Sequence, residues 1–323
     1  MKTLPGVVAC TVGAACAFLI DAALYRVTGF SSVMLVSIAL GMMVGNIRPL
    51  PISTNEGIRY TATHVLKFGV ALLGLAVPAG AILALGWRVL LTIVGIIIAG
   101  FLATLAFGRL LGLSRSHALM VGSGCTICGA AAISATHGVL AKKEEHEFVT
   151  SIAVIVILGT ASMFLLPALL AGWNPDAAGV MIGGSIHEVS QVVAAGGIAG
   201  AAVLPIAVTV KLGRVLLLAP VIAMLSNIER KHAEAADSLP PIIPVFVLGF
   251  VALVIVRTFL PVPSLAITGI ELLRNALFAA AMFAQGTGVT LDTLRRAGAR
   301  PFIFGTLVSL VVAAVSLLGA LTL

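Results

Sequence analysis

Several long stretches of this 323-residue sequence, six of which are given below, contain no Lys, Arg, Asp or Glu and consist mostly of apolar residues. A helix that crosses a bilayer needs about 20 such residues, and each of these six reaches that length. Only 10% of the residues are charged, whereas soluble domains carry about 25%. We therefore expect an all-α polytopic membrane protein, and the composition excludes a soluble enzyme, a disordered chain and a secreted disulfide scaffold. The six stretches are 27–47, 89–108, 116–141, 148–175, 189–210 and 301–323.

Hydropathy, interrupted by Gly, Pro and charged residues, divides the chain into about eleven membrane segments. No soluble domain fits between them, so we expect a single membrane domain over residues 1–323. We expect the first segment to be retained as a helix, because no small-residue cleavage site closes it. The segments are 5–25, 31–47, 62–84, 89–108, 117–138, 148–171, 178–197, 202–226, 242–260, 270–290 and 301–322.

The positions of Lys and Arg predict how these segments are oriented, because cytoplasmic loops are enriched in both residues. With a cytoplasmic N-terminus, ten of them would lie inside and five outside. The other four fall within predicted spans: Lys67, Lys211, Arg214 and Arg274. The same enrichment accounts for the net charge of +7 without a nucleic-acid partner. We expect a multi-pass membrane protein with a cytoplasmic N-terminus.

An internal repeat supports an inverted architecture. The Lys67-Phe-Gly that opens the third segment matches the Lys211-Leu-Gly that opens part of the eighth, with two Leu at the same offsets. Five segments separate the two copies, and an odd number of crossings inverts one copy relative to the other. Inverted repeats of five helices recur in secondary transporters. We expect the repeats to cover 31–171 and 178–322, with 5–25 as an extra helix.

Two segments combine glycine with small polar residues in mid-membrane. The fifth contains Gly124, Cys125, Thr126, Cys128 and Gly129, and the tenth contains Gln285, Gly286, Thr287 and Gly288. Interrupted helices at matching places in two halves indicate a transporter site, and their half-helix N-termini suit an anion. We predict that 124–129 and 285–288 are non-helical, cross near the midplane and bind substrate. The alternative is a helix whose small residues allow close packing.

The Cys125-x-x-Cys128 spacing also raises redox or zinc chemistry. No second such pair and no His pair stands at ligand spacing, and redox motifs of this kind usually open a soluble helix. We expect no metal and no cofactor. We interpret the thiols as packing residues or weak hydrogen-bond donors.

Ionisable residues inside predicted spans are the remaining candidates, because they are expensive in a bilayer and are functional by default. His187, Glu188 and Gln191 lie in the seventh segment, where we predict that they couple transport to protons; the alternative is solvation near the headgroups. Gln191 stands where a zinc protease motif needs its second His, which excludes that chemistry. Lys211 and Arg214 would balance the charge of an anion, or would snorkel to the interface. Asp21, Glu271 and Arg274 are expected at interfaces.

Four motifs in order resemble a family of bacterial inner-membrane proteins named as sulfate exporters, the YeiH-like proteins. They are GCTICGAAAI (124–133), GSIHEVSQVVAAG (184–196), VKLGRVLLLAPV (210–221) and AMFAQG (281–286). The family's SICGxSAI element is TICGAAAI here, so Ala131 lacks a hydroxyl that the family usually has. The resemblance covers essentially the whole chain and implies the inverted-repeat fold of bile-acid-symporter-like transporters, with two crossed, unwound helices.

These features together predict a secondary transporter that exports a small anion, such as sulfate, sulfite or an organosulfonate, with proton coupling. No ATP-binding motif of the G-x-x-x-x-G-K-[ST] kind occurs. The alternatives are a sodium-coupled antiporter or organic-anion symporter on the same fold, and an intramembrane enzyme that uses Cys125 and Cys128 or His187 and Glu188. We expect the partners to be an inorganic or organic anion and the lipid bilayer, with a homodimer left open.

Overall fold

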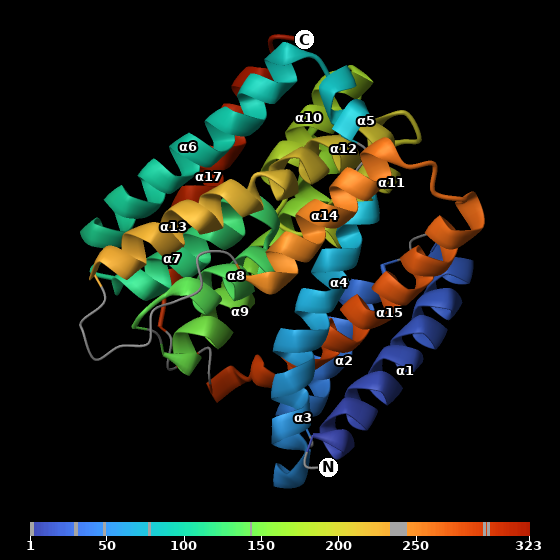
Figure 1. Ribbon diagram of the computed structural model, residues 1–323, viewed down its shortest axis with the longest axis vertical. Coiled ribbons are helices and arrows are strands. Elements are labelled where there is room, and N and C mark those ends of the chain that lie inside the picture. The colour runs from blue at the N-terminus through green and yellow to red at the C-terminus, as the bar shows by residue number, and fades with distance from the viewer. Residues whose placement is uncertain are drawn as a thin grey trace.

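The computed structural model describes residues 3–28, 32–47, 50–76, 79–142, 144–232, 244–292, 295 and 298–323. Within these ranges the secondary structure is entirely helical (Figure 1). The helices are α1 (Leu4–Thr28), α2 (Val33–Ile47), α3 (Asn55–Tyr60), α4 (Leu66–Leu73), α5 (Ala79–Ala84), α6 (Trp87–Leu110), α7 (Arg115–Ser123), α8 (Ala130–Val139), α9 (Glu145–Leu169), α10 (Pro175–Ser185), α11 (Val189–Ala199), α12 (Val203–Leu216), α13 (Leu218–His232), α14 (Val245–Phe259), α15 (Ser264–Gly288) and α17 (Arg300–Ala320).

Six of the described helical stretches are long and apolar enough to cross a membrane, which confirms a polytopic membrane protein. They are Leu4–Val27, Trp87–Leu110, Glu145–Leu169, Val203–Arg230, Leu265–Gly288 and Arg300–Ala320. The stretch Val203–Arg230 joins α12 and α13 into one 28-residue span. A π-helical turn, Thr61–Val65, joins α3 to α4.

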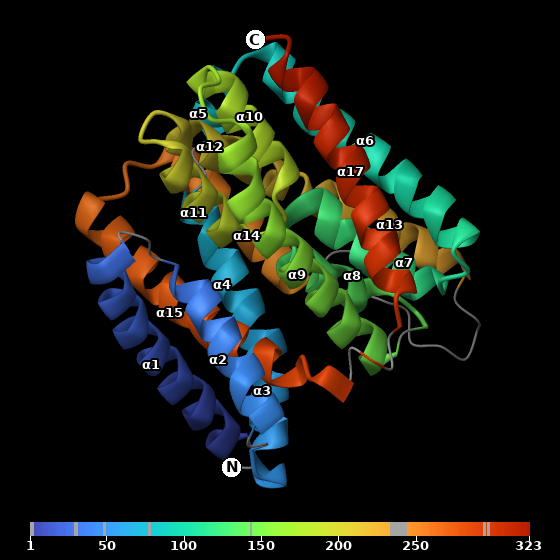
Figure 2. The ribbon, with the colours of Figure 1, turned by 180° about the vertical axis from the view of Figure 1, so that it is seen from behind.

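The helices form two bundles: both views set α1, α2, α3 and α15 apart from α6 to α13 and α17 (Figures 1 and 2), and α14 is grouped with the former because it packs along α4. Bundle I contains α1 to α4, α14 and α15; bundle II contains α6 to α13 and α17. In bundle I, α2 packs along α15 so closely that a Cβ on Gly41 or Gly286 would overlap the backbone of the other helix. In bundle II, α6 packs along α17, and α10 packs against both α12 and α17.

The fifth predicted segment does not cross the membrane. It consists of α7, the π-helical turn Gly124–Cys128 and α8, and the chain reverses at Gly129, where φ is +76°. The hydroxyl of Thr136 on α8 donates to that of Ser123 on α7 over 2.9 Å, so the two helices run antiparallel. We call this element hairpin H1.

The base of H1 confirms the reversal. Arg115, at its start, lies 2.9 Å from the Glu229 carboxylate near the end of α13. The backbone N–H of Ala141, beyond its end, donates to the other oxygen of Glu229 over 3.5 Å. Both ends of H1 therefore lie at the same face of the protein. We call this the N face, because α1 also begins there, and the opposite side the C face.

The seventh predicted segment is a second hairpin, H2, made of α10 and α11. Gly179 and Gly183 of α10 contact α12 at Ile206 and Ala207, whereas Gly196 near the end of α11 contacts Leu204 near the start of α12. The helices α10 and α11 therefore run in opposite directions along α12, and H2 enters from the C face. The prediction that the fifth and seventh segments each cross the membrane is wrong. Each hairpin is as apolar as a membrane-spanning helix because it is surrounded by protein. Hydropathy therefore cannot show that the chain reverses within it.

Candidate functional site

The tips of the two hairpins meet in the interior of bundle II. One oxygen of the Glu188 carboxylate accepts a 2.5 Å hydrogen bond from the backbone N–H of Ala130, the first residue of α8. Glu188 is also the N-cap of α11 and forms a reciprocal capping box with Gln191. One carboxylate therefore caps two half-helix N-termini, where unpaired N–H groups and the helix dipole favour negative charge.

Gly129 is required at this contact for two reasons. Its φ of +76° belongs to a conformation that residues with a Cβ rarely adopt. A Cβ built there would also overlap the carboxylate of Glu188. The predicted break at 124–129 is confirmed, although Gly124–Cys128 keeps a π-helical turn and the reversal lies at Gly129.

Two fixed cations bind the opposite, C-terminal ends of the interrupted helices. The ammonium of Lys211 donates to the carbonyls of Ile127 in H1 over 3.0 Å and Ile186 in H2 over 2.7 Å. Arg214 also bridges both hairpins: it donates to Thr126 over 2.7 Å and to Gly184 over 2.8 Å. Both side chains are 0% exposed, which excludes snorkelling to the interface. Cations are favoured there because the last carbonyls of a helix carry partial negative charge.

His187 lies beside this junction and is 1% exposed. Its Nε2 is 2.8 Å from the hydroxyl of Ser309 on α17, and its Nδ1 has no hydrogen-bond partner. The Ser309 hydroxyl in turn lies 3.6 Å from the thiol of Cys125. His187 therefore lies in the protein interior, which rules out the headgroup position that the sequence left open.

The hydroxyl of Thr126 is hydrogen-bonded within hairpin H1. The hydroxyl donates to the carbonyl of Gly122 over 2.8 Å, and the methyl group packs against Gly100 of α6. Gly124 packs between Ile133 and Ile155. Thr126 and Gly124 were predicted to contact substrate, but they pack against neighbouring helices instead.

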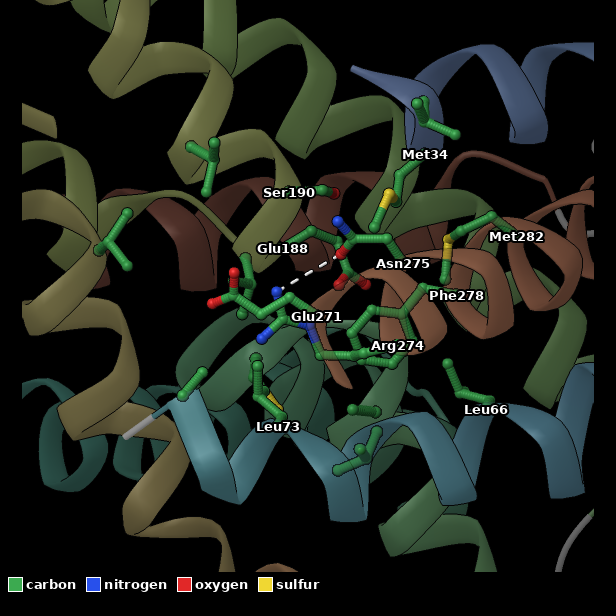
Figure 3. Close-up of a pocket in the computed structure, with 18 of the residues that line it drawn as sticks. Met34, Leu66, Leu73, Glu188, Ser190, Glu271, Arg274, Asn275, Phe278 and Met282 are labelled. Carbon is green, nitrogen blue, oxygen red and sulfur yellow. Dashed lines mark hydrogen bonds between the residues drawn. The ribbon is translucent and has the colours of Figure 1, made fainter. Parts of the chain in front are cut away.

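A cavity of about 440 Å³ opens between the two bundles and ends at the hairpin tips (Figure 3). Bundle II contributes Glu188 and Cys128, and α15 of bundle I contributes Arg274. Figure 3 shows Glu188 and Arg274 entering the same space from different helices. The cavity also holds Ser32 at the start of α2 and Leu73 at the end of α4, so it lies toward the C face. We call it the C-face cavity.

Sequence reasoning missed the bundle I side of this cavity. Glu271 and Arg274 were expected at an interface, but both line the cavity together with Asn275. Arg274 lies in the interior of α15, and its guanidinium donates a hydrogen bond to the side-chain oxygen of Asn275 over 3.4 Å. An ionisable residue inside a predicted span was the signal that could have identified it.

The tenth segment is not interrupted at 285–288, so that prediction is wrong. The helix α15 continues to Gly288, and Gly286 is the residue that lets α2 and α15 touch. Gln285 donates to the carbonyl of Ala62 over 3.3 Å, and Thr287 donates to Ala284 over 2.8 Å. Glycine here permits close packing, the alternative that the sequence left open, and 285–288 does not meet H1.

Gln285 and Thr287 instead line a second cavity, of about 620 Å³. Its other walls include Gly45 at the end of α2, Arg59 of α3 and Glu145 at the start of α9. These helix ends lie opposite those around the C-face cavity. We call this second space the N-face cavity.

All four cysteines are free thiols, and Cys125 and Cys128 are buried. In the part of the chain that the structure describes, no group of three or more His, Cys, Asp or Glu residues is placed to hold a metal ion.

Comparison with known proteins shows that this chain is similar to a family of membrane proteins. A family model described as conserved hypothetical protein 698 matches residues 5–305. A UPF0324 membrane protein of Corynebacterium glutamicum is 38% identical over 324 residues, which cover 99% of this chain and 92% of the relative. One from Bordetella bronchiseptica is 37% identical over 307 residues, 91% of this chain and 94% of the relative. One from Pasteurella multocida is 35% identical over 284 residues, 86% and 84% of the two chains.

Proposed function

Because this chain belongs to the family described as conserved hypothetical protein 698 and is a relative of the UPF0324 membrane proteins, we propose that it is a secondary transporter for a small anion and not an enzyme. The sulfate, sulfite or organosulfonate implied by the sequence resemblance is such an anion. One observation carries the proposal: a cavity between two helix bundles ends on Glu188, a carboxylate held at the meeting point of two hairpin tips.

Two cavities on opposite faces support transport. The C-face cavity and the N-face cavity both lie between bundle I and bundle II, and the hairpin tips line only the former. A transporter needs a site that opens to one face at a time. A small movement of bundle II against bundle I would close one cavity and open the other to the hairpin tips.

The chemistry at the tips supports an anion and a proton as the transported pair. The Glu188 carboxylate accepts the hydrogen bond of the Ala130 N–H. An anionic substrate would therefore compete with Glu188 for the N-terminus of α8, which carries partial positive charge. Protonation of Glu188 would remove that competition. The other titratable or charged groups around this point are Lys211, Arg214, His187, Cys128, Arg274 and Glu271.

A carboxylate that shares its site with an anion moves one proton in the same direction as the anion. The anion then leaves the cell when its own outward gradient exceeds the inward proton gradient. Export therefore needs no further energy source, in keeping with the absence of an ATP-binding motif from the sequence. His187, one residue from Glu188, would tune the exchange through its contact with Ser309.

Sodium coupling is the second candidate, and the occupied carbonyls argue against it. Sodium sites in broken-helix transporters use unwound carbonyls and half-helix C-termini. Here the carbonyls of Thr126, Ile127 and Ile186 already accept hydrogen bonds from Lys211 or Arg214. A fixed cation therefore holds the place that a sodium ion would need.

With the two hairpins in place, more of the Lys and Arg residues lie on the N face than on the C face. This difference supports a cytoplasmic N face in the inner membrane. Because H1 turns back, Lys142 lies on the N face rather than opposite it. Positive residues in inner-membrane loops favour the cytoplasmic side. The N face holds Arg59, Arg109, Arg115, Lys142, Arg230, Arg295 and Arg300, and the C face holds Arg26, Arg88 and Arg257.

Flux through the purified protein tests the proposal. Proteoliposomes at a uniform internal pH are diluted into acidic buffer that contains one radiolabelled anion: sulfate, sulfite or a short alkanesulfonate. We expect at least one anion to accumulate above equilibrium while the pH gradient lasts, and to leak out when a protonophore is added. Flux that needs sodium in place of the pH gradient would favour the second candidate, and no flux of any anion would overturn the proposal.

A further inference from the structure

The walls of the C-face cavity are chemically uneven. One side is apolar: Leu66, Val70 and Leu73 of α4 face the cavity with Phe278 and Met282 of α15. The polar groups are concentrated around Glu188 and Arg274 (Figure 3). A site built for a fully hydrated inorganic ion would offer donors on every side, whereas this one offers a charged end and a long apolar wall.

The positive charge available to a ligand is small. Arg274 is the one Lys or Arg among the described residues that line the cavity. Lys211 and Arg214 lie behind the tips, 0% exposed, and donate their hydrogen bonds to backbone carbonyls. Glu271, one turn before Arg274 on the same helix, adds a negative charge to the wall. A single arginine flanked by a carboxylate suits one negative charge better than two.

The size of the cavity also exceeds what a simple oxyanion fills. A volume of about 440 Å³ lies within the range of pockets that hold organic ligands, about 300–1,000 Å³. An inorganic sulfate placed against Arg274 would leave Leu66, Val70 and Leu73 facing water. Burial of an apolar group against those side chains and against Phe278 would be favourable.

We propose that the C-face cavity binds an amphipathic organic monoanion, a sulfonate or carboxylate with an apolar body, in preference to inorganic sulfate. The anionic group pairs with Arg274 at the end of the cavity that Glu188 also lines, and the body lies against Leu66, Val70, Leu73 and Phe278. This inference rests on the proposed function, since it names the substrate class of the same site. It narrows the range of sulfur anions that the sequence resemblance implies.

Binding of a homologous series to the full-length protein tests this assignment. The probes are sodium salts of linear alkanesulfonates from methanesulfonate to hexanesulfonate, with sodium sulfate and hexylammonium chloride as comparisons at constant ionic strength. We expect the dissociation constant to fall roughly fourfold for each added methylene, the factor expected for burial of one CH₂, until the cavity is full. Sulfate should bind more weakly than hexanesulfonate by at least tenfold.

Variants separate the cavity from nonspecific partition into detergent. Arg274→Gln should weaken binding of every alkanesulfonate at least tenfold, and Phe278→Ala should reduce the gain per methylene. Arg26→Gln, a change of an exposed arginine at the C-face end of α1, is the matched control and should leave the whole series unchanged. If Arg274→Gln does not fold, the loss of chain-length dependence in Phe278→Ala still tests the assignment.

Three results would overturn the inference. They are equal binding of sulfate and hexanesulfonate, affinity that does not change with chain length, and binding of hexylammonium in place of the sulfonates. Proton-driven accumulation of sulfate without alkanesulfonate binding would refute this inference and leave the proposed function intact. Absence of flux for every anion refutes the proposed function instead.

Discussion

Glu188 accepts a hydrogen bond from the backbone N–H of Ala130, across the tips of two hairpins whose contacting residues are 58 positions apart in sequence. The bond joins a side chain at the start of α11 to the start of α8, so each half-helix N-terminus depends on the other hairpin. Lys211 joins the two C-terminal ends in the same way, through Ile127 and Ile186. The junction is therefore held by opposite charges at opposite helix ends.

Gly129→Ala should destabilise this junction. The backbone conformation there disfavours a Cβ, which costs about 1–3 kcal/mol, and the new methyl group overlaps the Glu188 carboxylate. We expect a lower melting temperature of the purified protein and loss of anion flux. Gly138→Ala is the control, because nothing lies within 4 Å of a Cβ at Gly138; it should melt like the unaltered protein. Equal melting and flux for the two variants would contradict the geometry.

Lys211→Met should weaken folding more than a surface change of the same kind. It leaves the carbonyls of Ile127 and Ile186 without their ammonium donor, and each buried polar group without a partner costs about 1–3 kcal/mol. Thermal unfolding in detergent measures the effect. Lys142→Met, at an exposed position beyond H1, should cause little change. A melting temperature for Lys211→Met that equals that of Lys142→Met would show that the ammonium does not hold the tips.

The hairpins predict which loops are reached from the same side of the membrane. Lys142→Cys and Arg59→Cys should react with a membrane-impermeant maleimide from one side, because both positions lie on the N face. Asp176→Cys, at the start of α10, should react from the other side. Labelling of intact spheroplasts and of inverted vesicles distinguishes the two. If Lys142→Cys reacted from the C face and Asp176→Cys from the N face, the fifth and seventh segments would each cross the membrane, and the two hairpins would be wrong.

Anion flux should not require sodium. The carbonyls that could coordinate the ion at the hairpin tips are bonded to Lys211 and Arg214. Replacing all sodium by choline in the proteoliposome assay should leave the initial rate within about twofold of its original value. A rate that saturates with sodium concentration would mean that the fixed cations do not take its place.

The apolar runs predicted the membrane helices well, because burial in lipid or in protein demands the same side chains. For that reason they could not distinguish a crossing helix from a hairpin that protein surrounds. The reversal at Gly129 was detectable as a break, since glycine beside small polar residues weakens a helix. Gly286 also lies beside small polar residues, but it is glycine because α15 packs closely on Gly41 of α2. Only the packing of the folded protein distinguishes a glycine that breaks a helix from one that allows close packing.

Among the candidate site residues, single ionisable residues were the most informative. His187, Glu188, Lys211 and Arg214 were all selected because charge is expensive in an apolar segment, and the structure brings them to one junction. Their partners could not be predicted, because most of these are backbone groups on another hairpin. Arg274 carried the same signal but lay closer to a predicted helix end, and the cavity that gives it a role forms only between the two bundles.

The proton-coupled account is tested most directly by Glu188→Gln in proteoliposomes, with pH-gradient-driven accumulation and anion exchange at equal pH measured on the same preparation. The amide oxygen of Gln can still accept from Ala130, so the junction should persist, but the side chain no longer carries a proton. The account predicts that accumulation is lost while exchange continues at a rate within about threefold of the original. Accumulation against the anion gradient at the original rate would contradict it, because Glu188 would then not be the residue that couples proton and anion.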